Sequence, residues 1–124
     1  MDAVTAVSGS GPAYFFLFVE ALIDAAVQLG LPPGMAKTMV VQTMLGSSRL
    51  IEQSGKEPSD LRKMVTSPGG TTAEALYYLE KAGFRTAISR AVWAAYLRSA
   101  ALGQGKGRSQ APNLAGSFKP ASRP

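Results

Sequence analysis

Apolar residues recur with helical spacing along most of the first hundred positions of the chain. Residues 13–31 are the most apolar stretch, and their polar side chains Glu20, Asp24 and Gln28 recur every fourth position, which places them in one line along a helix. A helix with a single polar line buries most of its circumference, and a small monomer can hardly supply that much cover. The pattern therefore predicts a helix that packs against a partner surface.

Glycine and proline divide the rest of the pattern into further helices. Gly30 and the two prolines after it end the first helix, and Gly-Ser-Gly-Pro at residues 9–12 is typical of a turn before it. Apolar residues with helical period predict four more helices, over residues 34–53, 58–66, 72–82 and 84–102. No segment alternates with period two for more than a few residues, so the sequence predicts an all-α fold of about five helices.

The first apolar stretch does not have the character of a membrane segment or a leader. Two carboxylates near the centre of a membrane span would cost several kcal/mol, and no basic residue precedes the apolar run. We therefore expect no membrane partner.

The composition excludes much familiar enzyme chemistry. The chain of 124 residues contains no cysteine and no histidine. Disulfides, thiolate nucleophiles, Ser–His or Cys–His catalysis and the usual zinc sites therefore have no residues to use, and we expect no metal. A protein without cysteine is also consistent with the cytoplasm, which is the compartment that we expect.

The net charge of +5 arises mostly in the last part of the chain. Residues 1–102 hold nine basic and eight acidic side chains, whereas residues 103–124 hold four basic side chains and no acidic one. This polar segment, rich in Gly, Ser and Pro, has too few apolar groups to offset chain entropy, so we expect a flexible basic tail. Because no aromatic residues alternate with its lysines, we expect no nucleic-acid partner.

One motif suggests a binding site, the sequence Ser-Pro-Gly-Gly-Thr-Thr at residues 67–72, which we call the 67–72 corner. Gly69 and Gly70 allow a sharp turn and a close approach to a ligand, and a helix begins just after them. The first N–H groups of a helix have no internal partner and carry partial positive charge, so they suit a carboxylate or a phosphate. Ser67 and Thr72 add hydroxyl groups. The alternative is a plain helical corner with a threonine cap, in which Thr71 caps the helix and pairs with Glu74.

Three other features of the sequence are weaker candidates for a binding or catalytic site. Gly-Ser-Gly at residues 9–11 lacks the third glycine and the two strands of a dinucleotide site. Glu20 and Asp24 could form an acid/base pair, but on one helix face they more readily pair with a packed neighbour. Trp93 and Tyr96 are typical of a core or an interface.

Several segments in order resemble one known family. They are "DAVTAVSGSGPAYFFLFVEALIDAA", "GLPPGMA", "QTMLGSS", "VTSPGGTTAEAL" and "AGFRTAISRAV", between Asp2 and about Leu102. Together they resemble the C-terminal dimerisation domain of pyrroline-5-carboxylate reductase, and "VTSPGGTT" is the most specific of them. The resemblance implies reduction of 1-pyrroline-5-carboxylate to L-proline with NADPH or NADH, the last step of proline biosynthesis.

The resemblance also implies partners and residue roles. An intertwined helical homodimer is expected, which in some members assembles into a decamer. Ser67 and the N–H groups around Gly69, Gly70 and Thr71 would bind the substrate carboxylate, and the hydroxyl of Thr72, the expected catalytic residue, would bind the ring nitrogen. NADP or NAD would bind to an N-terminal Rossmann domain, which is absent from this chain. We expect the isolated chain to be inactive alone; the alternative is a non-catalytic helical assembly module that kept the fold without the chemistry.

Overall fold

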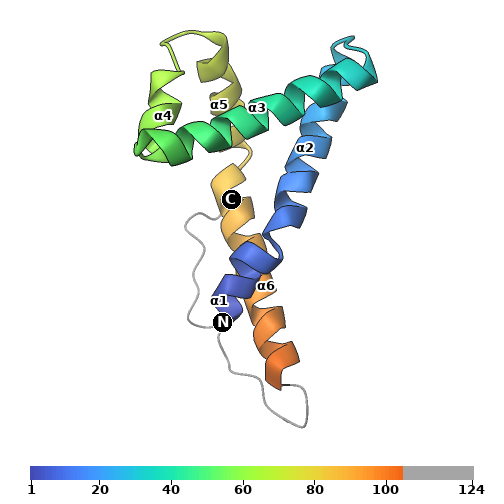
Figure 1. The fold of residues 1–124 in the computed structure, drawn as a ribbon, viewed down its shortest axis with the longest axis vertical. Helices are drawn as coiled ribbons and strands as arrows, with labels where there is room; N and C mark the ends of the chain where they lie inside the picture. The colour runs from blue at the N-terminus through green and yellow to red at the C-terminus, as the bar shows by residue number, and fades with distance from the viewer. Residues whose placement is uncertain (105–124) are drawn as a thin grey trace. The chain divides into compact units, whose positions relative to one another are not determined.

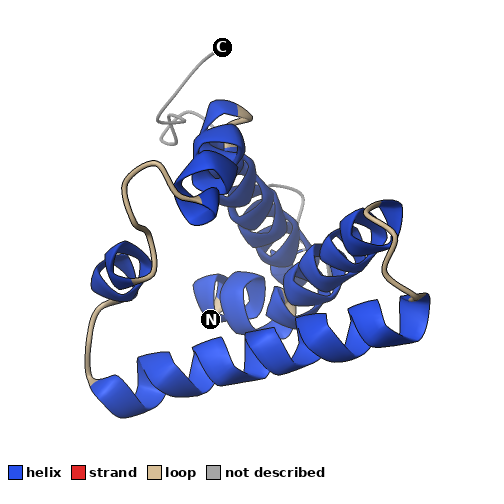
Figure 2. Ribbon diagram, turned by 90° about the horizontal axis from the view of Figure 1, so that it is seen from above, coloured by secondary structure: helices blue, strands red, loops and turns tan. Residues whose placement is uncertain are grey.

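The computed structural model describes residues 1–104, which form helices joined by short loops and contain no strand (Figure 2). Figure 1 shows the helices in chain order. They are α1 (Asp2–Val4), the π-helix η1 (Thr5–Gly9), α2 (Gly11–Gln28), α3 (Pro33–Ser54), α4 (Pro58–Met64), α5 (Thr71–Lys81) and α6 (Phe84–Gln104). The prediction of an all-α fold with five principal helices is confirmed. The predicted tail lies outside the described residues, apart from its first two, which extend α6.

The helix boundaries follow from proline and glycine. Helices α3 and α4 begin at Pro33 and Pro58, where the missing N–H and the fixed φ of proline suit the first helical turn. Helix α2 ends at Gln28, and Gly30 follows with a φ of 105°, a left-handed conformation that favours glycine.

The first nine residues differ from the sequence prediction. We expected a turn at residues 9–12, but the chain is already helical from Asp2, and η1 leads into α2 with only a bend at Ser10. The Ser10 N–H donates to the Thr5 carbonyl at 2.8 Å, the longer ring of a π-helix. Pro12 has no N–H to give, which is compatible with an irregular junction of this kind.

The chain divides into two compact units, and the division falls inside α2 and α5. One unit consists of Met1–Ala13 with Leu76–Pro124 and is called the α6 unit below; the other, Tyr14–Ala75, is called the α3 unit.

In the α6 unit, α1 and η1 both pack against α6. Ala6 is fully buried there and Ala100 nearly so, because alanine lets two helix backbones approach closely. The Ser99 hydroxyl of α6 donates to the Asp2 carboxylate of α1 at 2.7 Å and so links these two helices.

In the α3 unit the helices pack together much less. No two of them make more than isolated contacts within the described residues, and the buried apolar side chains are Ala36, Val40 and Leu61. Helix α2 exposes most of its apolar surface: Phe16 is 71% exposed and Leu17 66% exposed. The partner surface that the sequence predicts for this helix is therefore not supplied by its own unit.

The helical stretch Asp2–Gln28 is long and apolar enough to cross a membrane, judged by length and composition alone. Its most apolar part has a mean hydropathy of 1.4. The core helix of a soluble protein meets the same criterion, so the property does not distinguish a membrane from a protein partner.

Candidate functional site

The 67–72 corner lies wholly within the α3 unit, between α4 and α5. After Met64 the chain leaves the helix, and Thr66 fixes the exit by donating its hydroxyl proton to the Arg62 carbonyl at 2.5 Å. The chain then turns back at Gly69, which has a φ of +71°. A residue with a Cβ is strained in this left-handed conformation, so the turn requires glycine at this position.

A backbone hydrogen bond closes the turn. The Gly70 N–H donates to the Ser67 carbonyl at 3.0 Å, and the Gly70 carbonyl in turn accepts from the Glu74 N–H at 3.1 Å. Gly70 thus occupies the N-cap position of α5, and Thr71 is the first residue of the helix. The expectation that Thr71 caps the helix with its side chain is wrong, because Thr71 lies inside the helix rather than before it.

The geometry leaves three N–H groups at the start of α5 without a backbone partner in the described structure, those of Thr71, Thr72 and Ala73. They point out of the N-terminal end of a helix of 11 residues, where the helix dipole is positive. The Gly70 N–H, by contrast, is already engaged in the turn. Such an end can accept a carboxylate or a phosphate oxygen.

The side chains of the corner add neutral hydroxyl groups to these donors. Ser67 and Thr71 are exposed and Thr72 is half-buried. The only ionisable side chain in the first turn of α5 is Glu74, which is exposed and stabilises the helix start through the dipole. The structure therefore brings Ser67, Gly69, Gly70, Thr71 and Thr72 together in one short corner, and it supplies hydrogen-bond donors there without a fixed positive charge.

Elsewhere in the described part of the chain, no cluster suggests acid/base or metal chemistry. Residues 1–104 contain no group of three His, Cys, Asp or Glu side chains that could hold a metal ion. Glu20 and Asp24 are exposed on α2, and no hydrogen bond or ion pair is found for either in this part of the chain.

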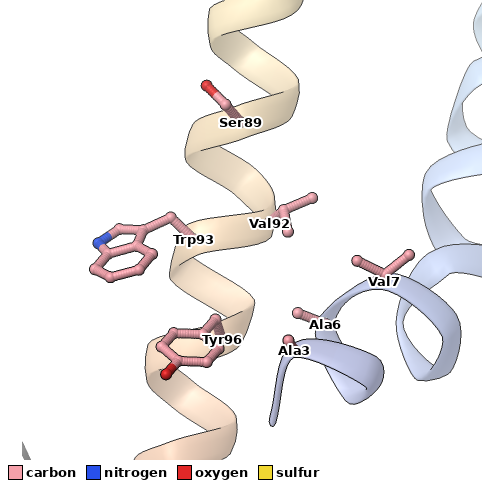
Figure 3. Close-up of a pocket in the computed structure, with 7 residues that line it drawn as sticks. All are labelled: Ala3, Ala6, Val7, Ser89, Val92, Trp93 and Tyr96. Carbon is pink, nitrogen blue, oxygen red and sulfur yellow. The ribbon is translucent and has the colours of Figure 1, made fainter. Parts of the chain in front are cut away.

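The α6 unit contains an apolar hollow of about 470 Å³ (Figure 3). Its lining comes from α1 and η1 on one side and from α6 on the other: Ala3, Ala6, Val7, Ser89, Val92, Trp93 and Tyr96. Trp93 and Tyr96 stack with ring centroids 5.3 Å apart, and the Ser89 hydroxyl donates to the Thr86 carbonyl at 3.1 Å. An apolar surface of this kind suits a packed side chain better than a charged ligand. The sequence predicted the aromatic pair as core or interface but not the hollow.

Comparison with known proteins gives one consistent family. Residues 1–102 match the family model described as pyrroline-5-carboxylate reductase dimerisation. Pyrroline-5-carboxylate reductases of Synechocystis and Arabidopsis thaliana are 53% and 50% identical to this chain over 104 and 103 residues, covering 84% and 83% of it. The same alignments cover only 39% and 37% of those relatives, so the chain spans about two-fifths of their length.

Solved structures agree with this result. The Plasmodium falciparum pyrroline carboxylate reductase, solved with NADP bound, superposes with a TM-score of 0.81 at 46% identity, covering 83% of this chain and 39% of that one. The Streptococcus pyogenes 1-pyrroline-5-carboxylate reductase superposes with a TM-score of 0.78 at 39% identity, covering 79% of this chain and 38% of that one.

Proposed function

The chain belongs to the pyrroline-5-carboxylate reductase dimerisation family, and on this premise we propose that it is the substrate-binding and dimerisation part of such a reductase. The reaction is the reduction of 1-pyrroline-5-carboxylate to L-proline with NADPH or NADH, in the cytoplasm. The observation that supports this role best is the 67–72 corner, where the unpartnered N–H groups at the start of α5 match the carboxylate of the substrate.

In this proposal the carboxylate binds to the N–H groups of Thr71, Thr72 and Ala73, and the Ser67 hydroxyl donates a further hydrogen bond. Gly69 shapes the turn, and Gly70 closes it through its own N–H. A carboxylate held by several donors is fixed in orientation as well as in place, which aligns the ring attached to it.

Thr72 acts on the other end of the ring. Its hydroxyl has no hydrogen-bond partner in the described structure and is half-buried beside the corner. Threonine is far too weak an acid to protonate an imine near neutral pH, so Thr72 orients an already protonated ring nitrogen or relays a proton to it. Its contribution is the placement of the imine carbon.

The nicotinamide cofactor supplies the hydride for this reaction. Residues 1–104 contain no strand and therefore no strand–turn–helix of the kind that binds a dinucleotide. The chain's own part is to bind and orient the substrate, and the cofactor site belongs to a Rossmann domain elsewhere in the reductase.

A homodimer is the proposed assembly, with a decamer as a further stage. The exposed apolar surface of α2 supports it, because a second copy supplies the matching helix without the cost of placing Glu20 and Asp24 in a lipid core. A non-catalytic assembly module would need the same dimer but not the corner.

A matched pair of substitutions in the reductase that contains this domain tests the role of Thr72. Thr72→Val removes the hydroxyl, keeps the N–H and nearly conserves the shape; Thr71→Val makes the same change one residue earlier. We expect Thr72→Val to lower kcat by about 100-fold through misplacement of the ring, and Thr71→Val to leave it within about twofold. A Thr72→Val variant with the kcat of the parent would remove Thr72 from the site, and a complete lack of reductase activity in the parent would leave the assembly module as the better explanation.

A further inference from the structure

The two glycines of the 67–72 corner are required for different reasons. Gly69 has a φ of +71°, and a Cβ built on it meets no atom within 4 Å. Gly70 has no such backbone conformation, so its φ is open to other residues, but a Cβ built on it would lie 2.8 Å from the Ser67 Oγ and 3.3 Å from the Ser67 carbonyl oxygen. Gly69 is therefore required by the left-handed backbone conformation, and Gly70 by the lack of room for a Cβ atom beside Ser67.

This crowding is unusual in the protein. Among the glycines of residues 1–104, Gly70 is the one at which an added Cβ would approach another atom more closely than 3.4 Å. In real structures a Cβ atom essentially never lies within 3.0 Å of an atom in a residue that is not adjacent in the chain. A side chain at residue 70 therefore forces Ser67 to move.

The shift falls on the Ser67 hydroxyl. The Ser67 carbonyl is held by the Gly70 N–H at 3.0 Å, so the turn resists movement of the backbone. The hydroxyl is the free end of a side chain and rotates at low cost to another staggered position. A residue larger than glycine at position 70 would move the Oγ away from the start of α5, whereas its 3.3 Å approach to the Ser67 carbonyl oxygen requires the turn to give by only a few tenths of an ångström.

We propose that Gly70 is a positioning residue, whose missing Cβ provides the space in which the Ser67 hydroxyl lies beside the free N–H groups of α5. The inference rests on the proposed function, since it assigns that hydroxyl to the substrate carboxylate. It adds that the affinity for the carboxylate depends on Gly70, which has no side chain with which to contact the ligand.

A double-mutant cycle in the reductase tests the proposal with four proteins: the parent, Gly70→Ala, Ser67→Ala and the double variant. A hydrogen bond to a charged group contributes about 1.5–3 kcal/mol, so we expect either single variant to raise the KM for 1-pyrroline-5-carboxylate at least tenfold. Saturating substrate should restore most of kcat. The double variant should bind no more weakly than Ser67→Ala, because without the Oγ the new Cβ displaces nothing that binds.

Gly34→Ala is the matched control. Gly34 lies in the same unit near the start of α3, has an ordinary φ, and a Cβ there meets no atom within 4 Å. We expect its KM to equal that of the parent. Thermal unfolding of all variants, followed by circular dichroism, separates a change in helix stability from a change in binding.

The outcomes distinguish this inference from the proposed function. If Ser67→Ala leaves KM unchanged, the carboxylate does not bind to the Ser67 hydroxyl and the inference is overturned, whereas the proposed function, which rests on the N–H groups of α5 and on Thr72, is then decided by Thr72→Val. If Ser67→Ala raises KM but Gly70→Ala does not, the corner remains the substrate site and the inference is overturned. It is likewise overturned if the two substitutions multiply in the double variant, because Gly70 would then act through the backbone and not through the Ser67 hydroxyl.

Discussion

The two units of the chain differ in how closely their helices pack on one another. In the α6 unit, α1 and η1 lie against α6, with Ala6 and Ala100 buried between helices and a hydrogen bond from Ser99 to Asp2. In the α3 unit, the helices make only isolated contacts with one another, and α2 exposes Phe15, Phe16 and Leu17. The helices of the first unit therefore pack on one another, whereas those of the second bury Ala36, Val40 and Leu61 but barely touch each other.

This difference indicates that the α3 unit is the one that requires a partner. The same unit contains the 67–72 corner. A loop between helices that do not pack on each other is held only when something else fixes those helices. Dimerisation and substrate binding are therefore coupled in our proposal, because the second copy that covers α2 also stabilises the unit in which the corner is built.

The largest effect is expected from a charge on the exposed face of α2. Phe16→Asp removes about 2–3 kcal/mol of apolar burial per protomer and places a carboxylate in the interface. Because a symmetric dimer carries the change twice, we expect its dissociation constant to rise by at least about a thousandfold. Sedimentation equilibrium over a range of protein concentrations measures it.

Gln28→Asp is the control for this variant, since it adds the same charge to the polar line of the same helix and should leave the dissociation constant nearly unchanged. An unchanged mass for Phe16→Asp would contradict the dimer through α2. If the parent chain instead binds lipid vesicles and Phe16→Asp abolishes that binding without altering the mass, a membrane covers this helix and not a second copy.

A smaller effect is expected from a larger side chain inside the α6 unit, at a position that has no room for additional atoms. Ala6 is fully buried, and Ala6→Leu would force additional carbon atoms between helices at a cost of about 1–3 kcal/mol. Urea unfolding at a fixed protein concentration measures the change. Ala94→Leu, on an exposed position of α6, is the matched control. A tolerated Ala6→Leu would mean that the α6 unit is as loosely packed as the α3 unit, and the comparison above would fail.

The sequence predicted the helices well because their ends coincide with proline and glycine. Pro33 and Pro58 begin two of them, and Gly30 follows the end of another. The helical residues 2–9 could not be predicted in the same way, since Gly-Ser-Gly-Pro locally favours a turn. Packing of Ala6 in the α6 unit stabilises a helix there, and that contact joins residues far apart in the chain.

The 67–72 corner was predictable in position but not in detail. The pattern Pro-Gly-Gly-Thr-Thr before a helix predicted a corner at the start of a helix, and from it the hypothesis of an anion site. It could not say that the Gly70 N–H is engaged with Ser67, that Thr71 lies inside the helix, or that a Cβ at residue 70 would meet the Ser67 hydroxyl. These facts depend on the left-handed φ of Gly69, which sets the path of the turn and which the sequence permits without requiring.

The smallest effect is expected from the exposed ion pair between α5 and α6. The Arg85 Nε donates to the two Glu80 carboxylate oxygens at 3.0 and 2.9 Å, but the two side chains are 69% and 50% exposed. Water and salt screen such a pair, so Arg85→Ala should lower the free energy of unfolding by no more than about 0.5 kcal/mol.

Ser99→Ala gives the scale for that measurement, because the Ser99 to Asp2 hydrogen bond is part-buried in the same unit and its loss should cost about 1–2 kcal/mol. Both variants are unfolded in urea at one protein concentration, and Arg85→Ala is repeated at high salt, where its small effect should vanish. If Arg85→Ala proved as costly as Ser99→Ala, the turn between α5 and α6 would be a main support of the α6 unit. Its stability would then not come chiefly from the packing of α1 and η1 on α6.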